Sequence, residues 1–350
     1  MTGPGPRNAI TDVPGLRVGM AEDEGVRTGV TVILPDARTV AAVDVRGGGT
    51  GTREVELLGA DGTVDAVDAI VLSGGSAFGL AAADGVAGWL AEAGRGFPVG
   101  SMHVPIVPSA ILFDLLNGGD KTNFTADTEA QPYRTLGRRA ADAAGLDVVN
   151  GTSGAGYGAT TTGHDGRRLK GGQGTASFVT EDGTTVGALA AVNALGSTVG
   201  NARGQFLAGA LEYGDEFGGR GGPDRIDPRA HPIKKHADAD AAMNTTLAVV
   251  ATDAPLDVRQ ARRVAVMAQA GMARAIRPVF TPMDGDVVFV LSTAQGRQSD
   301  AAEVARIGME AADCLARAIA RGVFHAHALD DVWHAYADAY PDAAIEADGR

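Results

Sequence analysis

Two groups of polar residues stand directly before apolar runs in the second half of the chain. Asn244, Thr245 and Thr246 precede the run LAVVATDAPL, and the stretch MDGDVVFV places Asp284 and Asp286 before a second run. Hydroxyl groups are potential nucleophiles, and two carboxylates at positions i and i+2 of a strand point to the same face. Like charges on one face repel each other, so a cation or a shared proton usually accompanies such a pair. The two patterns thus place hydroxyl groups and a pair of carboxylates at the ends of predicted strands.

Both groups also have a purely structural interpretation. Asn is common in turns and Thr is favoured in strands, so MNTTLAVV also fits a turn followed by a strand. The Asp-Gly dipeptide is typical of turns, so DGD also fits a solvent-facing turn. These residue patterns alone leave the structural and the chemical interpretations open.

Two further polar residues stand in unusual surroundings. Lys170, in RRLKGGQGTAS, is followed by glycines that allow a backbone or a ligand to approach closely. Asn193, in ALAAVNALG, is an amide at the end of an otherwise apolar predicted strand. Neither residue identifies a site by itself.

The stretch GAGYGA, residues 154–159, matches the glycine pattern of dinucleotide-binding turns. That pattern requires a helix immediately afterwards, because the N-terminus of the helix binds the pyrophosphate. The following TTTGHDG is β-branched and interrupted by glycine, which disfavours a helix. A nucleotide-binding oxidoreductase is therefore kept only as an alternative function.

Composition excludes several classes of function. The formal net charge of −13 argues against nucleic-acid binding, which needs a surplus of Lys and Arg. The single cysteine, Cys314, lies in a helical pattern and cannot form an internal disulfide. No segment has 18 uninterrupted apolar residues, and the start of the chain has no apolar signal region. These two absences lead us to expect a cytoplasmic protein. His325, His327 and His334 could bind a metal at the surface, but histidines at a helix end and in a loop are more often solvated, so we expect no metal and no cofactor.

Predicted strands and helices alternate on both sides of a polar segment. Strands are expected within 30–45 and 69–73, a helix from Phe78 to Glu92, and a hairpin around residues 178–196. Residues 200–242 are rich in Gly, Pro and charge, and about 214–242 is expected to be a mobile linker. Beyond residue 244 the order strand, helix, strand, helix predicts an α/β arrangement.

The ordered motifs resemble the DmpA-type aminopeptidases, which include β-peptidyl aminopeptidases and nylon-oligomer (6-aminohexanoate oligomer) endo-hydrolases. The resemblance rests on ITDVPGLRVGM, GVTVILP, AVDVRGGGTGTRE, DAIVLSGGSAFGLAAADGV, VPIVPSAILFDL, LKGGQGTAS, AVNALG, NTTLAVVATDAPL and IRPVFTPMDGDVVF. It covers nearly the whole chain, and so many matches in order are far more specific than any one motif.

The resemblance implies a self-cleaving hydrolase with an N-terminal nucleophile and a four-layer αββα sandwich. The cut would fall between Asn244 and Thr245 and give an α portion, 1–244, and a β portion, 245–350, of one intertwined domain. A new terminal threonine needs no histidine, because its own α-amine, with an ordinary pKa of about 7.7–8.0, can accept the hydroxyl proton. The substrate would be a small peptide or an ω-amino-acid amide, and the enzyme a homo-oligomer, namely a tetramer of cut heterodimers.

The resemblance also assigns roles within the catalytic set. Asn193 would donate to the oxyanion, and Asp284 and Asp286 would orient the Thr245 hydroxyl or amine. The nylon-oligomer branch carries both Thr and DGD, as this chain does, whereas the aminopeptidase branch has Ser and Glu at the two aspartate positions. This favours ω-amino-acid amides over α-peptides as substrates.

One position departs from the pattern of that branch. The position expected for its active-site lysine holds Gly163, and Lys170 is the nearest replacement. Lys170 therefore enters the catalytic set with an undefined role. A non-catalytic relative that stays uncut remains a further alternative.

Overall fold

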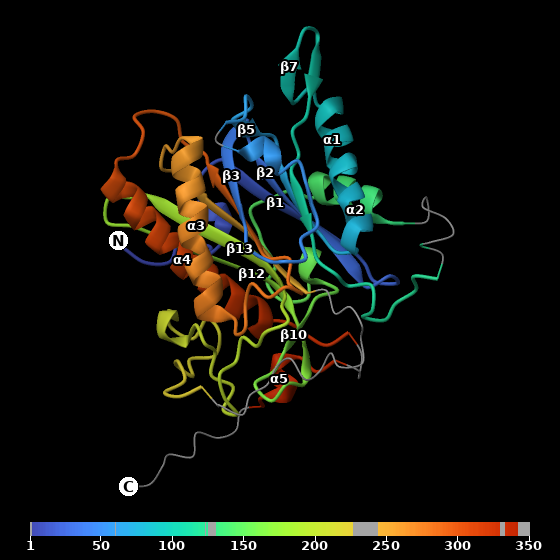
Figure 1. Cartoon of the computed structure of the whole chain (residues 1–350), viewed down its shortest axis with the longest axis vertical. Coiled ribbons are helices and arrows are strands. Elements are labelled where there is room, and N and C mark those ends of the chain that lie inside the picture. The colour runs from blue at the N-terminus through green and yellow to red at the C-terminus, as the bar shows by residue number, and fades with distance from the viewer. Residues whose placement is uncertain are drawn as a thin grey trace.

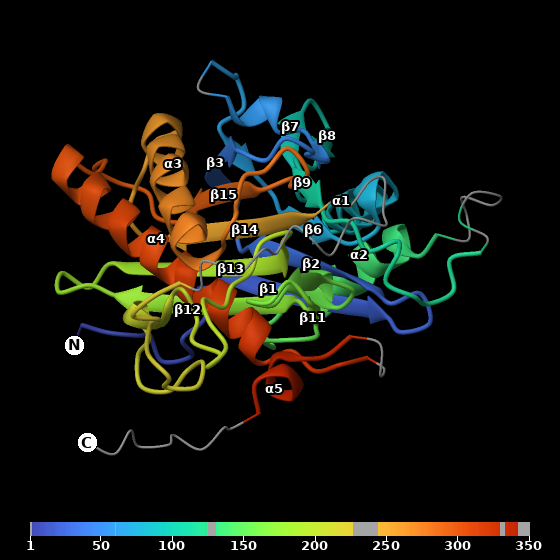
Figure 2. The same cartoon turned by 60° about the horizontal axis from the view of Figure 1, so that its bottom comes forward.

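Two β-sheets lie face to face between two pairs of helices, as Figures 1 and 2 show. The computed structural model describes residues 2–59, 61–122, 124, 131–226, 244–329 and 333–341. The order of the layers is helices, sheet, sheet, helices, so the predicted αββα sandwich is confirmed.

The larger sheet combines strands from both sides of the Asn244–Thr245 bond. Its six strands follow the order β12-β13-β14-β15-β3-β5. Their bounds are Gly172–Val179 (β12), Thr185–Asn193 (β13), Thr245–Thr252 (β14), Val287–Ser292 (β15), Thr39–Val45 (β3) and Ala66–Val67 (β5). The pair β14 and β15 is parallel, and both strands are antiparallel to their outer neighbours β13 and β3. The predicted β portion is thus inserted into the middle of a sheet whose other strands precede it in the chain.

The smaller sheet is built from the first third of the chain. Its five strands follow the order β1-β2-β6-β9-β4. Their bounds are Leu16–Asp23 (β1), Thr28–Pro35 (β2), Ile70–Ser73 (β6), Ser109–Ile111 (β9) and Thr52–Arg53 (β4). Two short hairpins stand apart from both sheets: β7 (Phe97–Val99) with β8 (Met102–Val104), and β10 (Thr160–Thr162) with β11 (Arg168–Lys170).

The helices cover the outer faces of the two sheets. Helices α1 (Ala82–Glu92) and α2 (Tyr133–Asp142) pack on the smaller sheet, and α3 (Val258–Ala275) and α4 (Ala301–Phe324) pack on the larger one. A short helix, α5 (Tyr336–Ala339), packs against the end of α4. The side chains of Asp257 and Asp300 cap α3 and α4 by accepting N–H groups of the first turn.

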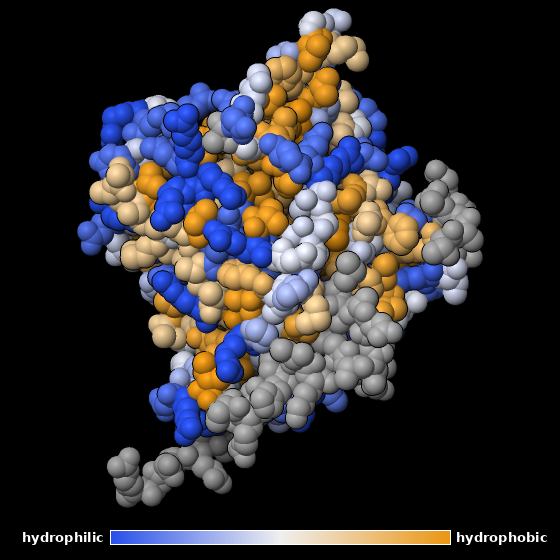
Figure 3. Space-filling view, in the orientation of Figure 1, coloured by the Kyte–Doolittle hydropathy of each residue, from blue (hydrophilic) through white to orange (hydrophobic). Residues whose placement is uncertain are grey.

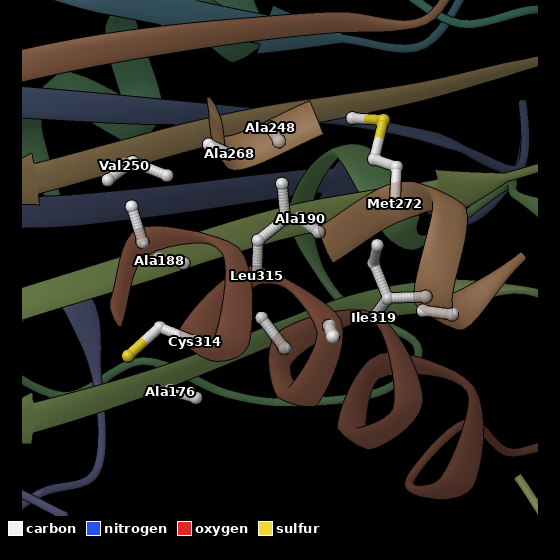
Figure 4. Packing of buried hydrophobic residues seen from close by; sticks show 14 of the residues in the cluster. Ala176, Ala188, Ala190, Ala248, Val250, Ala268, Met272, Cys314, Leu315 and Ile319 are labelled. Carbon is white, nitrogen blue, oxygen red and sulfur yellow. The ribbon is translucent and has the colours of Figure 1, made fainter. Parts of the chain in front are cut away.

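Strand β14 shows why this sequence must lie in the centre of the molecule. Leu247, Val249 and Ala251 point into the core between the two sheets. Ala248 and Val250 point the other way, toward α3 and α4, as Figure 4 shows. Because side chains alternate along a strand, burial on both faces requires the continuous apolar run LAVVA. The strand that starts at Thr245 is therefore held rigidly from both sides.

Two sequence-based expectations need correction. The linker expected over 214–242 is wrong for its first part, because Phe217 is 1% exposed and Glu216 forms an ion pair with Arg317. The Gly and Pro content gave no sign of these two contacts. The ring of Phe217 also packs against that of Phe206. Residues 227–242 lie outside the described residues. The GAGYGA stretch forms a three-residue 3-10 turn, Gly154–Gly156, followed by strand β10. It therefore lacks the helix that a dinucleotide-binding turn requires.

Candidate active site

Thr245 is the first residue of β14, and its side chain is buried against the preceding peptide bond. Thr245 is 2% exposed and Asn244 is 4% exposed. The Thr245 hydroxyl donates a hydrogen bond of 2.5 Å to the carbonyl oxygen of Asn244. The hydroxyl thus lies directly against the peptide bond that the sequence motifs single out. A strand does begin here, but a turn followed by a strand does not by itself explain this contact.

Asn193 lies opposite Thr245 in the larger sheet. Strands β13 and β14 are antiparallel, and their register pairs these two residues. Directly opposed side chains share a face of the sheet, with Cβ atoms about 4.5–5.5 Å apart. Oδ1 of Asn193 accepts the N–H of Thr160 at 2.9 Å, and Nδ2 donates to the carbonyl oxygen of Phe113 at 3.0 Å. Because Nδ2 carries two hydrogens, the fixed amide can donate a second hydrogen bond on this face.

Asp286 is bonded to the peptide next to the candidate nucleophile. Its carboxylate accepts the N–H of Thr246 at 2.7 Å and the N–H of Phe280 at 3.0 Å. Asp284 and Asp286 are each 1% exposed. A solvent-facing turn is therefore the wrong interpretation of DGD, since burial places both carboxylates inside the molecule.

Asp284 is held from the other side of the same loop. Its carboxylate accepts the N–H of Leu195 at 3.1 Å and the hydroxyl of Thr281 at 2.5 Å. For both aspartates, the partners that the described residues supply are N–H groups and a hydroxyl rather than cations. Burial raises the pKa of Asp284, and burial together with the charge of Asp284 raises the pKa of Asp286 to about 7. The two carboxyl groups are thus set up to hold a proton or to receive a cation near neutral pH.

The Asn244 peptide is clamped by the strand edge that carries the two aspartates. The N–H of Asn244 donates to the carbonyl oxygen of Met283 at 2.9 Å, and the N–H of Gly285 donates to the carbonyl oxygen of Asn244 at 2.8 Å. These bonds form an isolated parallel bridge between Asn244 and Asp284. The bridge continues the register of β14 and β15, in which Leu247 pairs with Val287. The candidate cleavage site is therefore part of the sheet and is not a loop.

The loop after β3, residues 46–49 (RGGG), is bonded to the backbone of both aspartates. The N–H groups of Arg46 and Gly47 donate to the carbonyl oxygen of Asp286 at 3.0 and 3.2 Å, and that of Gly49 donates to Asp284 at 2.8 Å. A Cβ atom on Gly47 would lie 2.3 Å from both the Asp284 oxygen and the Asp286 nitrogen. The motif RGGG has no role among the sequence-based expectations. Its run of glycines was the available signal, because such a run permits close backbone approach.

Lys170 is buried and is bonded to backbone carbonyls. Its Nζ donates to the carbonyl oxygens of Gly156, Ala159 and Gly171 at 3.0 to 3.1 Å. Lys170 is 1% exposed, and burial lowers its pKa to about 7. These contacts fix the turn that leads into Thr160, whose N–H holds the side chain of Asn193. Lys170 is thus joined to the site through this turn, whereas Gly163, the position expected for a lysine, lies beside Tyr340.

Metal ligands do not gather anywhere in the described part of the chain. No group of three or more His, Cys, Asp or Glu side chains there has the geometry to hold a metal ion. Cys314 is a buried free thiol in α4, as its helical surroundings predict. No helix in the described ranges is long and apolar enough to cross a membrane.

Comparison with known sequences gives one family over almost the whole chain. Residues 8–334 match the model of peptidase family S58. An uncharacterized aminopeptidase of Mycobacterium tuberculosis is 43% identical, over 96% of this chain and 99% of the relative. A 6-aminohexanoate-oligomer endohydrolase of Kocuria sp. is 31% identical, over 81% of this chain and 74% of the relative.

Comparison with solved structures supports the same arrangement of layers. The L-aminopeptidase D-Ala-esterase/amidase of Ochrobactrum anthropi, described as a variant of the Ntn hydrolase fold, superposes with a TM-score of 0.66. It is 22% identical, and the match covers 93% of this chain and 88% of that one. A β-aminopeptidase of Burkholderia sp. gives a TM-score of 0.64 at 24% identity, over 92% and 88% of the two chains.

Proposed function

The chain belongs to peptidase family S58 and is an amide hydrolase of the aminopeptidase type, and we propose that Thr245 becomes its nucleophile through self-cleavage after Asn244. The observation that carries this proposal is the contact of the Thr245 hydroxyl with the Asn244 carbonyl oxygen at 2.5 Å. This hydrogen bond holds Oγ1 beside the peptide bond that it would attack, and such positioning before the reaction lowers the entropic part of the barrier.

The proposed self-cleavage begins with an acyl shift from nitrogen to oxygen. Oγ1 of Thr245 bonds to the carbonyl carbon of Asn244 and loses its proton, and the C–N bond breaks as the nitrogen of Thr245 gains a proton. Asp286, bonded to the adjacent N–H of Thr246, is the proposed acceptor of the hydroxyl proton. Water then hydrolyses the resulting ester, leaving a carboxylate on Asn244 and a free amine and hydroxyl on Thr245.

The cut also resolves the electrostatics of the buried aspartates. Asp284 and Asp286 have raised pKa values in the uncut chain, because burial disfavours the charge of both and the charge of Asp284 adds to this effect at Asp286. Cleavage would create an α-ammonium on Thr245, one residue from the N–H that Asp286 accepts. Among the described residues no cation contacts the pair, and we propose that this ammonium is the cation that the aspartates hold in place. After it loses a proton, the resulting α-amine serves as the base that accepts the Thr245 hydroxyl proton during turnover.

For substrate hydrolysis we propose an acyl-enzyme on Thr245, with Asn193 donating to the oxyanion and Lys170 positioning Asn193. The support is the opposed register of Asn193 and Thr245 and the bonds that fix the Asn193 amide. No cofactor enters the proposed steps. We further propose that the substrates are amides of ω-amino acids or of small peptides. The 6-aminohexanoate-oligomer endohydrolases at 30–31% identity support this choice.

We also propose that the enzyme is a cytoplasmic homo-oligomer, a tetramer of cut heterodimers. The β7–β8 hairpin projects from the body in Figure 1, and Figure 3 shows apolar surface over it at the top of the view. Val99, Met102 and Val104 on this hairpin are 55%, 66% and 47% exposed. Exposed apolar side chains gathered on a projecting element are typical of a protein interface. Sedimentation analysis of the wild-type protein and of a Met102→Lys variant tests this proposal.

The mass of the purified protein tests the cleavage proposal. Wild type is expected to give two chains, 1–244 and 245–350, and Thr245→Ala a single chain. Thr245→Ser keeps a hydroxyl and is expected to cleave. Thr252→Ala, at the far end of β14, is the matched control and should cleave as wild type does. A wild-type protein that stays one chain and still hydrolyses amides would overturn the proposal, and an uncut, inactive protein would be a non-catalytic relative.

A further inference from the structure

The peptide bond at the proposed cleavage site already has a hydrogen-bond donor on its carbonyl oxygen. Besides the Thr245 hydroxyl, the oxygen of Asn244 accepts the backbone N–H of Gly285 at 2.8 Å. Negative charge develops on this oxygen when Oγ1 attacks the carbonyl carbon, and effective oxyanion donors lie about 2.7–3.1 Å from it. The N–H of Gly285 therefore stands at the right distance before the reaction starts.

We propose that the N–H of Gly285 is an oxyanion donor both in self-cleavage and in substrate hydrolysis. The inference rests on the proposed function, because it takes Thr245 as the nucleophile. The inference adds a backbone donor that lies between the two aspartates. Because glycine has no side chain, a search for catalytic residue types would not find it.

The same donor serves both reactions because both pass through the same type of ester. After the acyl shift, the carbonyl group of Asn244 is attached to Oγ1 of Thr245. Attack on a substrate amide likewise joins the substrate's carbonyl carbon to Oγ1, while the amine leaves with a proton. In each ester the carbonyl oxygen lies next to Oγ1 of Thr245. The N–H of Gly285 is fixed beside Oγ1, so it can donate to the carbonyl oxygen of either ester. When Asn244 leaves after the cut, the N–H of Gly285 is released for the substrate.

The surroundings of Gly285 fix its N–H and explain the absence of a side chain. A Cβ atom at this position would lie 2.8 Å from Oγ1 of Thr245 and 2.7 Å from the carbonyl oxygen of Gly49. Both distances are shorter than real Cβ contacts. The backbone of Gly285 is thus packed between the nucleophile and the RGGG loop. A glycine is required for this close approach to the reacting atoms.

Asn193 and Gly285 reach Thr245 from two different elements. Asn193 is on β13, opposite Thr245, and Gly285 is on the segment just before β15, in register with the other side of β14. Preorganised donors aimed at one developing charge constitute an oxyanion hole, and we propose that these two groups form it. In the uncut chain the Gly285 donor is already engaged, whereas Nδ2 of Asn193 is bonded to Phe113.

The direct test replaces Gly285 with glycolic acid by nonsense suppression during translation. This change turns the N–H into an ester oxygen and adds no side chain. Self-cleavage is expected to slow by about a hundredfold to a thousandfold, the usual cost of one oxyanion donor. The matched control is glycolic acid at Gly183, whose N–H donates to Thr180 at 3.0 Å in a hairpin turn. Intact mass separates cleavage at residue 244 from hydrolysis of the introduced ester.

Several outcomes distinguish this inference from the proposed function. If wild type and the Gly183 control cleave and the Gly285 ester variant cleaves within about threefold of their rate, the Gly285 inference fails alone. If wild type does not cleave, the nucleophile assignment fails first. The Gly285 ester variant, once it has slowly matured, should show a lower kcat than wild type with a similar KM, because an oxyanion donor acts in the transition state. A raised KM with unchanged kcat would overturn the inference.

A side-chain variant keeps the inference testable if the ester variant does not fold. Gly285→Ala retains the N–H but forces a methyl group toward Oγ1 and Gly49. It should cleave and turn over at least about tenfold more slowly than wild type, with thermal unfolding confirming a folded chain. Wild-type rates for a folded Gly285→Ala protein would show that the backbone here is not packed against the nucleophile, and the inference would be lost.

Discussion

The N–H of Thr246 donates to the carboxylate of Asp286 at 2.7 Å. This contact lies between two backbone pairings that share the register of β14 and β15. Asn244 pairs with Asp284 on one side of this contact and Leu247 with Val287 on the other. A carboxylate is thus inserted into the β14–β15 ladder next to the proposed nucleophile. Its protonation state should control the first step of self-cleavage.

The pH dependence of self-cleavage tests this control. Burial and the charge of Asp284 raise the pKa of Asp286 to about 7. If ionised Asp286 accepts the Thr245 proton, the rate should rise with pH and level off above about 7. Asp284→Asn removes the repelling charge, so it should lower the pKa and move the rise to lower pH. Chains refolded into buffers between pH 5 and 9 and followed by mass would show this, and an unmoved or upward-shifted rise would contradict the assignment.

Asn193→Ala is expected to lower the kcat of matured enzyme by about a hundredfold or more, with a small change in KM. The physical reason is the loss of the amide that faces Thr245 across the β13–β14 pair. Asn201→Ala is the matched control, since Asn201 forms similar amide bonds, to Arg203 and Gln205, in a surface loop. Steady-state kinetics on a chromogenic amino-acid anilide measure the effect. Equal losses in both variants would show that Asn193 matters only for folding.

Lys170→Met separates a positioning role from proton transfer. Methionine fills the space but cannot donate to the carbonyls of Gly156, Ala159 and Gly171. If Lys170 acts by holding the turn that orients Asn193, the rate should fall by a similar factor at every pH. If it exchanges a proton, a limb near its lowered pKa of about 7 should vanish from the pH profile. Unchanged cleavage and turnover in Lys170→Met and in Lys170→Ala would remove the residue from the site.

The sequence predicted the elements of the site better than their contacts. The apolar run after Thr245 predicted β14, because strand periodicity is a local property. The shared face expected from the spacing of Asp284 and Asp286 stays a prediction, since both residues precede β15. Burial of the aspartates could not be predicted, since DGD is equally typical of an exposed turn. It depends on the RGGG loop, which is more than 230 positions away in the chain and contacts both residues.

Residues 214–242 and Lys170 also show that local sequence does not predict long-range contacts. Gly and Pro content predicted mobility over 214–242, but Phe217 is buried and Glu216 forms an ion pair with Arg317, about a hundred positions further along the chain. The family resemblance gives Lys170 a place in the catalytic set as the nearest replacement for a lysine at position 163, whereas the structure shows its Nζ bonded to three backbone carbonyls. Composition reports the average behaviour of a segment, and single buried side chains can override it.

Gly47→Ala tests whether the RGGG loop supports the aspartates. A Cβ atom here would lie 2.3 Å from backbone atoms of both Asp284 and Asp286, so it must displace the DGD turn. Self-cleavage should fall by at least about tenfold, since misplacing catalytic groups by about 1 Å can cost a hundredfold. Gly49→Ala is the control within the same triplet, because its Cβ would have no neighbour closer than 3.6 Å. Cleavage rates and thermal unfolding should separate the two variants, with Gly49→Ala close to wild type in both. If Gly47→Ala cleaved as fast as Gly49→Ala, the aspartates would not depend on this loop. Their burial would then have to be maintained by their other contacts, with Leu195, Thr246, Phe280 and Thr281.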